Sequence, residues 1–249
     1  MTGGEQFDGG KPYFAAVAES YDRLQAIVVG PSYRAGLGFV VDLIPHEADA
    51  MFTFVELGCG TAELTRRVLG RFARARAVAI DSEPAMLDIA RAKLSPYADR
   101  AEVREADVLT YGIPSCDVVL SAFMFHHVAP ERLAETLGRI AYALSPGGCL
   151  LLLDTMQVGP RWADRIGAQS WRVYQQHVAA AISAGRVTQA EIDARWAFKR
   201  KMKEESRDVE YRHRAEHVTK AMLEAGFDET GLVWRMFAST ILAGFMPES

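Results

Sequence analysis

A short segment near residue 58 combines glycine and acidic residues in a pattern typical of nucleoside-binding sites. Residues 54–63 read Phe-Val-Glu-Leu-Gly-Cys-Gly-Thr-Ala-Glu, so an apolar run leads into Gly-x-Gly and then into a helical pattern. Gly-x-Gly alone also occurs in tight turns that bind nothing, but its glycines let the backbone approach a ligand closely. Asp81 ends the next apolar run, 21 positions after Gly60, close to the spacing of about 20 residues at which an acid binds ribose hydroxyls. The spacing predicts a nucleoside ligand.

The charges around this turn indicate which nucleoside fits. A dinucleotide-binding turn has a third glycine three places after the second, whereas here Glu63 stands at that place and Glu56 precedes the loop. Two carboxylates repel a pyrophosphate and attract a ligand that carries an ammonium and a sulfonium. We therefore expect S-adenosylmethionine as the cofactor and not NAD.

The elements that must position these residues alternate between short apolar strands and amphipathic helices. Strands are predicted at residues 52–57, 77–80, 102–105, 118–122 and 149–153, and two closing strands at 232–237 and 239–245. Such alternation predicts right-handed βαβ crossovers and a mostly parallel sheet with both faces covered. The expected fold class is α/β, a Rossmann-like doubly wound sheet of seven strands with an antiparallel C-terminal edge strand and a helical lid insertion.

Helical segments flank this alternation on both sides. Apolar spacing predicts helices at 13–24 and 33–44, and Thr188-Gln189-Ala190-Glu191 is a capping box that opens a helix within a long strand-free stretch. We take that stretch as an insertion that covers one edge of the sheet. The expected organisation is a flexible leader at 1–12, N-terminal lid helices at 13–46, a cofactor-binding core at 47–156, a helical insertion that forms a lid and acceptor pocket at 157–217, and a last helix with closing strands at 218–249.

Composition narrows the class of protein further. The 249 residues are 49% hydrophobic and 24% charged, which is ordinary for a globular protein, and the net charge of −4 gives no basic field for nucleic acid. No apolar run is long enough to predict a membrane-spanning helix. Three scattered cysteines favour a reducing, cytoplasmic setting and argue against a disulfide frame or a metal site.

Taken together, the motifs resemble those of the class I S-adenosylmethionine-dependent methyltransferases. Residues 55–61 are similar to the first motif of that family and residues 79–87 to its second. The turn Glu105-Ala106-Asp107-Val108 resembles the acidic turn that contacts adenine, and 117–121, 126–128 and 144–148 resemble the later strand and loop signatures. Flanking segments, among them Tyr21-Asp22 and 189–192, resemble more faintly the branch that contains carboxy-S-adenosylmethionine synthase. The synthase of that branch uses an arginine of its helical insert, and Trp196 stands at that place here, beside Arg195.

The resemblance implies roles for individual residues. The turn should hold the methionine moiety, Asp81 should accept from both ribose hydroxyls, and Asp107 should bind the adenine amino group. The N-terminal helices should reach in through Tyr21 as part of a lid. The expected cofactor-binding residues are Tyr21, Glu56, Gly58, Cys59, Gly60, Asp81, Ser82, Met86, Asp107, Val108 and Ser121.

Catalysis of methyl transfer needs mainly alignment and exclusion of water, with a base only for an acceptor such as an alcohol, a phenol or a carbon acid. His126 and His127 follow the fourth predicted strand and are the candidate bases, although a histidine in this loop also commonly packs or caps. Three tryptophans of the insertion, Trp162, Trp171 and Trp196, either attach it to the sheet domain or wall an acceptor pocket.

Three hypotheses for the function follow. The first is a methyltransferase for a small molecule of specialised metabolism, without a nucleic-acid or membrane partner and with a homodimer left open. The second is an enzyme for which S-adenosylmethionine is itself the substrate, through carboxyl addition or through internal attack with loss of methylthioadenosine. The third is a binding module without catalysis.

Overall fold

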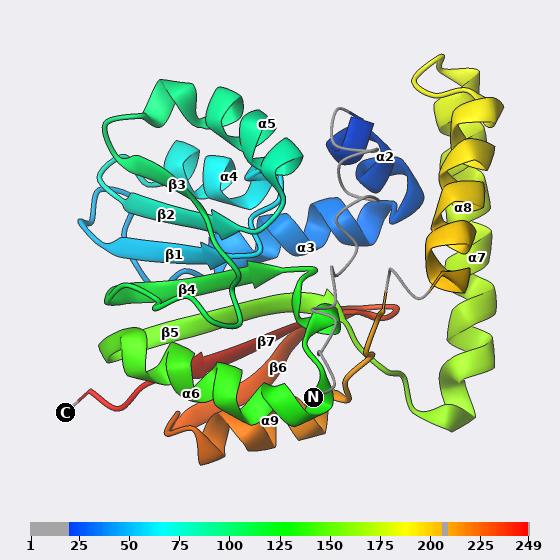
Figure 1. Ribbon diagram of the computed structural model, residues 1–249. Helices are drawn as coiled ribbons and strands as arrows, with labels where there is room; N and C mark the ends of the chain where they lie inside the picture. The colour runs from blue at the N-terminus through cyan, green and yellow to red at the C-terminus, as the bar shows by residue number, and fades with distance from the viewer. Residues whose placement is uncertain (1–19, 206–208, 249) are drawn as a thin grey trace, which may run out of the picture.

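The centre of the fold is a sheet of seven strands (Figure 1). The computed structural model describes residues 20–205 and 209–248. In spatial order the strands are β3 (Ala101–Glu105), β2 (Arg76–Asp81), β1 (Thr53–Leu57), β4 (Cys116–Ala122), β5 (Leu144–Thr155), β7 (Ser239–Phe245) and β6 (Glu229–Met236). Strands β1 to β5 are parallel, whereas β7 pairs antiparallel with both β5 and β6.

The strand order reverses between β1 and β4. From β1 the chain proceeds outward through β2 to β3, and it then returns to the other side of β1 as β4 and continues to β5. In an open parallel sheet, ligands bind at such a reversal, beyond the carboxyl ends of the strands. The glycine turn at 58–60 directly follows β1 and thus lies at this point.

Helices cover both faces of the sheet. One face carries α3 (Pro31–Asp42), α4 (Glu63–Arg71) and α5 (Pro84–Leu94), and the other carries α6 (Leu133–Ala143) and α9 (Ala215–Glu224). Leu37, Leu69 and Leu87 bury their side chains on the first face, and Leu137 and Met222 on the second. Each face therefore has its own apolar core, as a doubly wound sheet requires.

The predicted fold class is confirmed, with differences in detail at two elements. Strand β7 is not at the edge of the sheet, because it lies between β5 and β6, and β6 forms the edge itself. Strand β5 begins at Leu144, five residues before the predicted start at 149, and the preceding helix α6 ends at Ala143. The residue before a proline disfavours the helical conformation, and the chain is already extended at Leu144, two residues before Pro146.

The predicted lid and insertion form a separate group of helices, which we call the cap. It consists of α2 (Tyr21–Val28), α7 (Pro160–Ser183) and α8 (Gln189–Glu204). Thr188 and Glu191 form the expected capping box of α8. The cap helices pack on one another through Leu24, Ile27 and Val178, and not over an edge of the sheet as expected (Figure 1).

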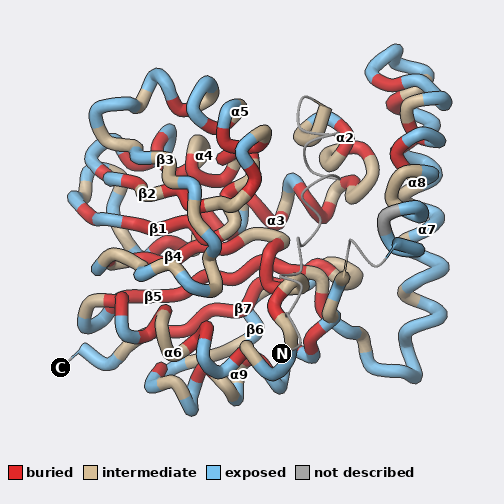
Figure 2. Tube along the Cα trace, viewed as in Figure 1, coloured by how far each residue is buried: buried red, intermediate tan, exposed pale blue. Residues whose placement is uncertain are grey.

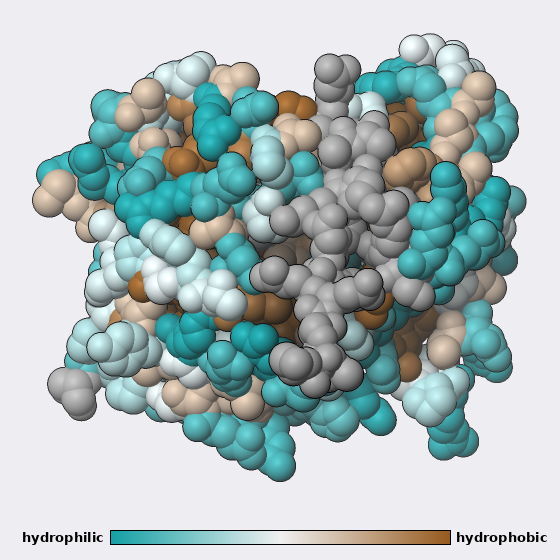
Figure 3. Space-filling model, in the orientation of Figure 1, coloured by the Kyte–Doolittle hydropathy of each residue, from teal (hydrophilic) through white to brown (hydrophobic). Residues whose placement is uncertain are grey.

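The cap is thin, and much of its surface faces solvent. Most of α7 is exposed, in contrast to the buried central strands of the sheet (Figure 2). Hydrophilic side chains cover the outer side of α7 and α8 (Figure 3). Residues 1–19, which include the predicted leader and the first part of the predicted helix 13–24, lie outside the described residues.

Within the described ranges, no single helix is long and apolar enough to cross a membrane. Helices α2 and α3 reach the required length and apolar character only when they are counted together, and they are bent by 108° relative to each other.

Candidate cofactor and acceptor site

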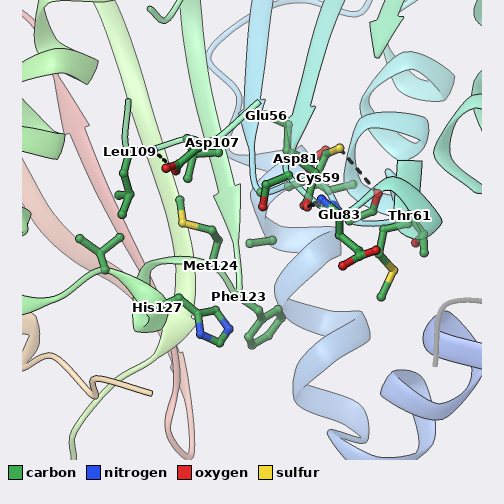
Figure 4. Close-up of a pocket in the computed structure, with 18 of the residues that line it drawn as sticks. Glu56, Cys59, Thr61, Asp81, Glu83, Asp107, Leu109, Phe123, Met124 and His127 are labelled. Carbon is green, nitrogen blue, oxygen red and sulfur yellow. Dashed lines mark hydrogen bonds between the residues drawn. The ribbon is translucent and has the colours of Figure 1, made fainter. Parts of the chain in front are cut away.

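A cavity of about 790 Å³ opens at the carboxyl ends of β1, β2 and β4. Its volume lies in the upper part of the range of roughly 300–1,000 Å³ that is usual for small-molecule sites. Ten of the eleven expected cofactor-binding residues line it, namely Tyr21, Glu56, Gly58, Cys59, Gly60, Asp81, Ser82, Met86, Asp107 and Val108. Figure 4 shows Glu56, Cys59 and Asp81 converging on one side of it and His127 on the other.

The glycine turn brings backbone to the cavity wall. Gly58 and Gly60 have φ angles of +70° and +51°, a region in which side chains are strained. A Cβ on Gly58 would lie 2.4 Å from Cγ of Met124, whereas a Cβ on Gly60 would meet nothing within 4 Å. The amides of Gly58 and Cys59 both donate to the carbonyl of Ile80 at 2.9 Å, which fixes the turn against β2.

Asp81 links this turn to the next helix. Its carboxylate accepts a hydrogen bond of 2.7 Å from the amide of Gly60 and one of 3.0 Å from the amide of Glu83. Burial raises the pKa of Asp81, and these amides act against that shift. The side chain therefore orders the turn as well as facing the cavity.

Glu56 is a carboxyl group with an unusual environment. Its side chain is buried, and one carboxyl oxygen accepts hydrogen bonds from both the amide and the hydroxyl of Thr65. Burial raises the pKa of Glu56 to about 8; Asp81 adds to the shift, and the Thr65 hydrogen bonds and Lys93 oppose it. Near pH 7 this carboxyl group is therefore mainly protonated.

Glu63, the second acid of the turn, is surrounded by cations. Its carboxylate contacts Arg66 and Arg67 at 2.9 Å each, and Nζ of Lys93 lies 3.6 Å away. Burial raises the pKa of Glu63, but these cations outweigh burial and leave it lowered. Both acids lie at the turn as expected, but one is paired with cations and the other is largely neutral near pH 7, so they do not act as two simple negative charges.

The side of the cavity assigned to adenine contains Ser82, Met86, Asp107 and Val108. Met86 is buried, and Asp107 is exposed at the cavity. Asp107 accepts a hydrogen bond of 2.8 Å from the amide of Leu109, which orients its carboxylate (Figure 4). An apolar wall and an oriented carboxylate are suited to a base with an exocyclic amino group.

Two of the predicted site residues are directed away from the cavity. Ser121 is 1% exposed and donates to the carbonyl of Leu57 at 3.1 Å, so it ties β4 to β1. His126 is absent from the cavity lining seen in the described residues. Its Nδ1 is 2.7 Å from a carboxylate oxygen of Asp154. Burial lowers the pKa of His126, but the charge and hydrogen bond of Asp154 outweigh burial and raise it.

His127 lies at the far end of the cavity from the glycine turn (Figure 4). Its Nδ1 is 3.1 Å from the carbonyl oxygen of Val209. Because a carbonyl only accepts, Nδ1 carries a proton, and in the neutral ring Nε2 is then the basic nitrogen. Tyr33 and Phe123 stack nearby with ring centroids 5.6 Å apart and form an aromatic wall.

Sequence reasoning missed this aromatic end of the cavity. Its lining includes Phe123 and Met124 after β4 and, near the end of the insertion, Val209 and Tyr211. The amide of Tyr211 donates to the carbonyl of His126 at 2.6 Å, which brings the end of the insertion to the loop after β4. Phe123 has a φ of +56°. No local sequence pattern predicts such a contact between distant segments.

The tryptophans of the insertion do not line the described part of the cavity. Trp162 and Trp171 are 59% and 55% exposed, so within residues 20–205 and 209–248 they are poorly placed to attach the insertion to the sheet or to wall a pocket. Trp196 donates from Nε1 to the hydroxyl of Tyr174 at 2.7 Å, inside the cap. Arg195 is buried and donates to the side chain of Gln25 at 2.5 Å.

Comparison with known proteins agrees with this geometry. Residues 54–148 match the family described as a methyltransferase domain. The carboxy-S-adenosyl-L-methionine synthase of Campylobacter lari is 28% identical over 140 residues, which are 56% of this chain and 59% of that protein. The synthase of the same name from Wolinella succinogenes is 25% identical over 219 residues, which are 85% of this chain and 84% of that protein.

A solved structure with the same fold is the complex of DhpI with SAH. It is 17% identical, with a TM-score of 0.64, and the match covers 99% of this chain and 98% of that chain. At this identity the likeness shows the fold alone. Residues 54–148, which match the family, supply most of the wall of the cavity described above.

Proposed function

Because this chain belongs to the class I S-adenosylmethionine-dependent methyltransferases, we propose that it transfers the methyl group of S-adenosylmethionine to a small-molecule acceptor. The observation that carries the proposal is a single cavity with two different ends. The glycine turn, Asp81 and Asp107 line one end, and Phe123 and His127 line the other. The arrangement supports a nucleoside at the first end and an apolar acceptor at the second.

The residues at the first end suit this cofactor. Gly60 leaves open space where a side chain would project, and the Asp81 carboxylate is oriented by two backbone amides. The cofactor supplies an activated methyl group bound to a positively charged sulfur. The chain binds the ribose through Asp81, places Met86 against the base, and holds Glu56 near the charged groups.

At the second end we assign proton transfer to His127. Nε2 of its Nδ1-protonated ring can accept the proton of an acceptor hydroxyl, and Val209 fixes that tautomer. His126 is a positioning residue in this proposal, since its ring and its amide both bind Asp154 and so order the loop that carries His127. The wall formed by Tyr33 and Phe123 favours a flat, largely apolar acceptor.

Synthesis of carboxy-S-adenosylmethionine is a second candidate, because curated relatives with that activity in their names match this chain at 25–32% identity. The branch resemblance implies an arginine of the insert that holds the extra carboxylate. Here Arg195 binds Gln25 instead and does not line the described part of the cavity, and Trp196 binds Tyr174. These contacts favour methyl transfer over the synthase reaction.

The test is to incubate the purified protein with S-adenosylmethionine alone, and then with a panel of hydroxylated aromatic acceptors, and to analyse the nucleosides by mass spectrometry. We expect S-adenosylhomocysteine only when an acceptor is present. Methylthioadenosine without an acceptor would identify internal cleavage. In a further incubation that adds a mixture of carboxylic acids as carboxyl donors, a nucleoside heavier by one carboxyl group would identify the second candidate. Binding without any product across the panel would argue for a module without catalysis.

A further inference from the structure

Asp22 in the cap contacts the cofactor turn through a cluster of side chains from three elements. One oxygen of its carboxylate accepts a hydrogen bond of 2.6 Å from the hydroxyl of Thr61, directly after Gly60, and the other forms an ion pair with Lys93 on α5. Nζ of Lys93 also donates to Thr61 at 3.0 Å. The three side chains thus form a closed triangle between α2, the turn and α5.

Two members of the cluster are sheltered from solvent, whereas the side chain of Asp22 is 35% exposed. Thr61 is 2% exposed, and the side chain of Lys93 is 16% exposed with Asp22 and Glu63 as its two anionic neighbours. A buried ammonium is unstable without a partner, so removal of one member of such a pair costs more than removal of a surface ion pair. Asp22 is thus held strongly to the turn and to α5.

Helix α2 also contacts the inserted helices, through one exposed ion pair, one hydrogen bond and an apolar cluster. Arg23 contacts Glu191 on α8 at 2.6 Å, and Arg195 binds Gln25. Leu24 and Ile27 share an apolar cluster with side chains of α7 and α8. A movement of α2 therefore moves the other two cap helices with it.

Tyr21, the neighbour of Asp22, is the cap residue of α2 that reaches the cavity. It packs with Phe198 of α8 against the buried Met86. Its hydroxyl accepts a hydrogen bond of 3.0 Å from Gln25, which in turn accepts one from Arg195. The position of Tyr21 over the assigned cofactor end thus depends on both α8 and the Asp22 cluster.

We propose that Asp22, Thr61 and Lys93 form a latch that holds the cap closed over the cofactor, with Lys93 as its positioning residue. This inference rests on the proposed function only in naming S-adenosylmethionine as the molecule beneath Tyr21. The latch binds at Thr61, within the turn that the cofactor contacts. Release of the cofactor past Tyr21 requires the cap to lift, and the cap lifts only when the contacts of Asp22 break.

The latch predicts faster release of cofactor when either charge is removed. Lys93→Met leaves Asp22 and Glu63 without their shared cation, and Asp22→Asn removes the ion pair while its side-chain oxygen still accepts from Thr61. We expect the dissociation rate of S-adenosylmethionine to rise about tenfold in each variant. The double variant should be no faster than the faster single variant, because both disrupt the same contact.

The measurement is a chase in which protein loaded with labelled S-adenosylmethionine is mixed with excess S-adenosylhomocysteine and filtered at intervals. The matched control is Asp88→Asn, which removes an exposed ion pair with Arg91 on the same helix as Lys93, and its rate should equal that of the wild type. Rates within twofold of wild type in both single variants, or effects that multiply in the double variant, would overturn the latch.

A second measurement needs no ligand and separates failure of the latch from failure of the proposed function. Hydrogen exchange of the α2 amides should be about tenfold faster in Lys93→Met and Asp22→Asn than in wild type and Asp88→Asn. If wild type fails to bind S-adenosylmethionine but α2 exchange accelerates, the latch stands and the proposed function falls. If wild type binds it and α2 exchange is unchanged in both variants, the latch falls and the proposed function stands.

Discussion

Replacing Glu56 with glutamine tests whether a carboxyl group in the cofactor site ionises only when the cofactor binds. Burial raises the pKa of Glu56 to about 8 in spite of two hydrogen bonds from Thr65. A cation placed beside a buried carboxyl group stabilises its charged form and lowers that pKa. Binding of S-adenosylmethionine near Glu56 should therefore release a proton from it at neutral pH.

The size of the effect follows from the pKa of the free protein. With a pKa of about 8, only about one carboxyl group in a hundred is ionised at pH 6, and nearly all are ionised above pH 9. If the pKa falls below 6 in the complex, the dissociation constant rises up to about a hundredfold between pH 9 and pH 6, or roughly 2.7 kcal/mol. Glutamine has no proton to lose, so the Glu56→Gln protein should lack this dependence.

Titration calorimetry from pH 6 to pH 9 on both proteins provides the measurement. The amino group of the ligand also titrates near pH 8, but it does so equally for both proteins and cancels in the ratio of their dissociation constants. Repeating the titration at pH 7 in buffers of different ionisation enthalpy counts the protons, and we expect wild type to release about one proton more than Glu56→Gln. A ratio that stays constant with pH, together with equal proton release, would refute the reasoning.

The same group makes a prediction for the protein without ligand. The pKa of Glu56 in the folded state lies above its ordinary value of 4.5, so the protonated form favours folding. Its contribution is complete below about pH 4.5 and is lost as the pH rises to about 8, at up to about 1.4 kcal/mol for each pH unit. Denaturant unfolding of wild type at pH 5 and pH 8 should show this loss, and Glu56→Gln should remove it.

Three further substitutions test other parts of the site. Asp81→Ala should raise the dissociation constant of S-adenosylmethionine at least about tenfold, or 1.4 kcal/mol, whereas the exposed Asp88→Ala should leave it unchanged in the same titration. His127→Gln should lower kcat toward a hydroxyl acceptor by about a hundredfold while the dissociation constant of the cofactor stays within twofold of wild type; an unchanged kcat would exclude His127 as the base. Gly58→Ala should lower the free energy of unfolding by about 1–3 kcal/mol for its positive φ alone, with an additional loss from the clash with Met124. A second substitution, Met124→Ala, should relieve only the part of that clash due to Cγ, because Cβ of residue 124 would still lie 2.6 Å from the new methyl group.

The parts of the fold that were predictable are those with a local cause. A strand that ends in Gly-x-Gly, and an acid that ends the next strand, place Gly58 and Asp81 side by side as soon as the two strands are parallel neighbours. The N-terminus of α8 was predictable for a similar reason, because Thr188 and Glu191 bind each other within one turn of helix. None of these inferences needs a contact between distant segments.

The end of the cavity that we assign to the acceptor was not predictable, because long-range contacts build it. Val209 and Tyr211 reach the loop after β4 through a chain that first forms two cap helices. His126 and His127 are adjacent in sequence and cannot be told apart there, yet Asp154 binds one ring and the carbonyl of Val209 binds the other. The direction of Ser121 likewise depends on a carbonyl of the neighbouring strand.

The expectation of S-adenosylmethionine rested on the charges of two acids at the glycine turn, and the structure shows that these charges are only part of the reason. The sequence places Glu56 and Glu63 at the turn, and their charges alone suggest repulsion of a pyrophosphate. In the structure Glu63 lies in the first turn of α4, where a helix N-terminus would otherwise favour an anionic ligand, and three cations neutralise it. Glu56 carries little charge near pH 7 until a cation approaches. The amide of Thr65 in this first turn donates to Glu56, so we expect selection against a pyrophosphate to depend on this occupied amide, and selection for a sulfonium ligand to depend on a carboxyl group that ionises on binding.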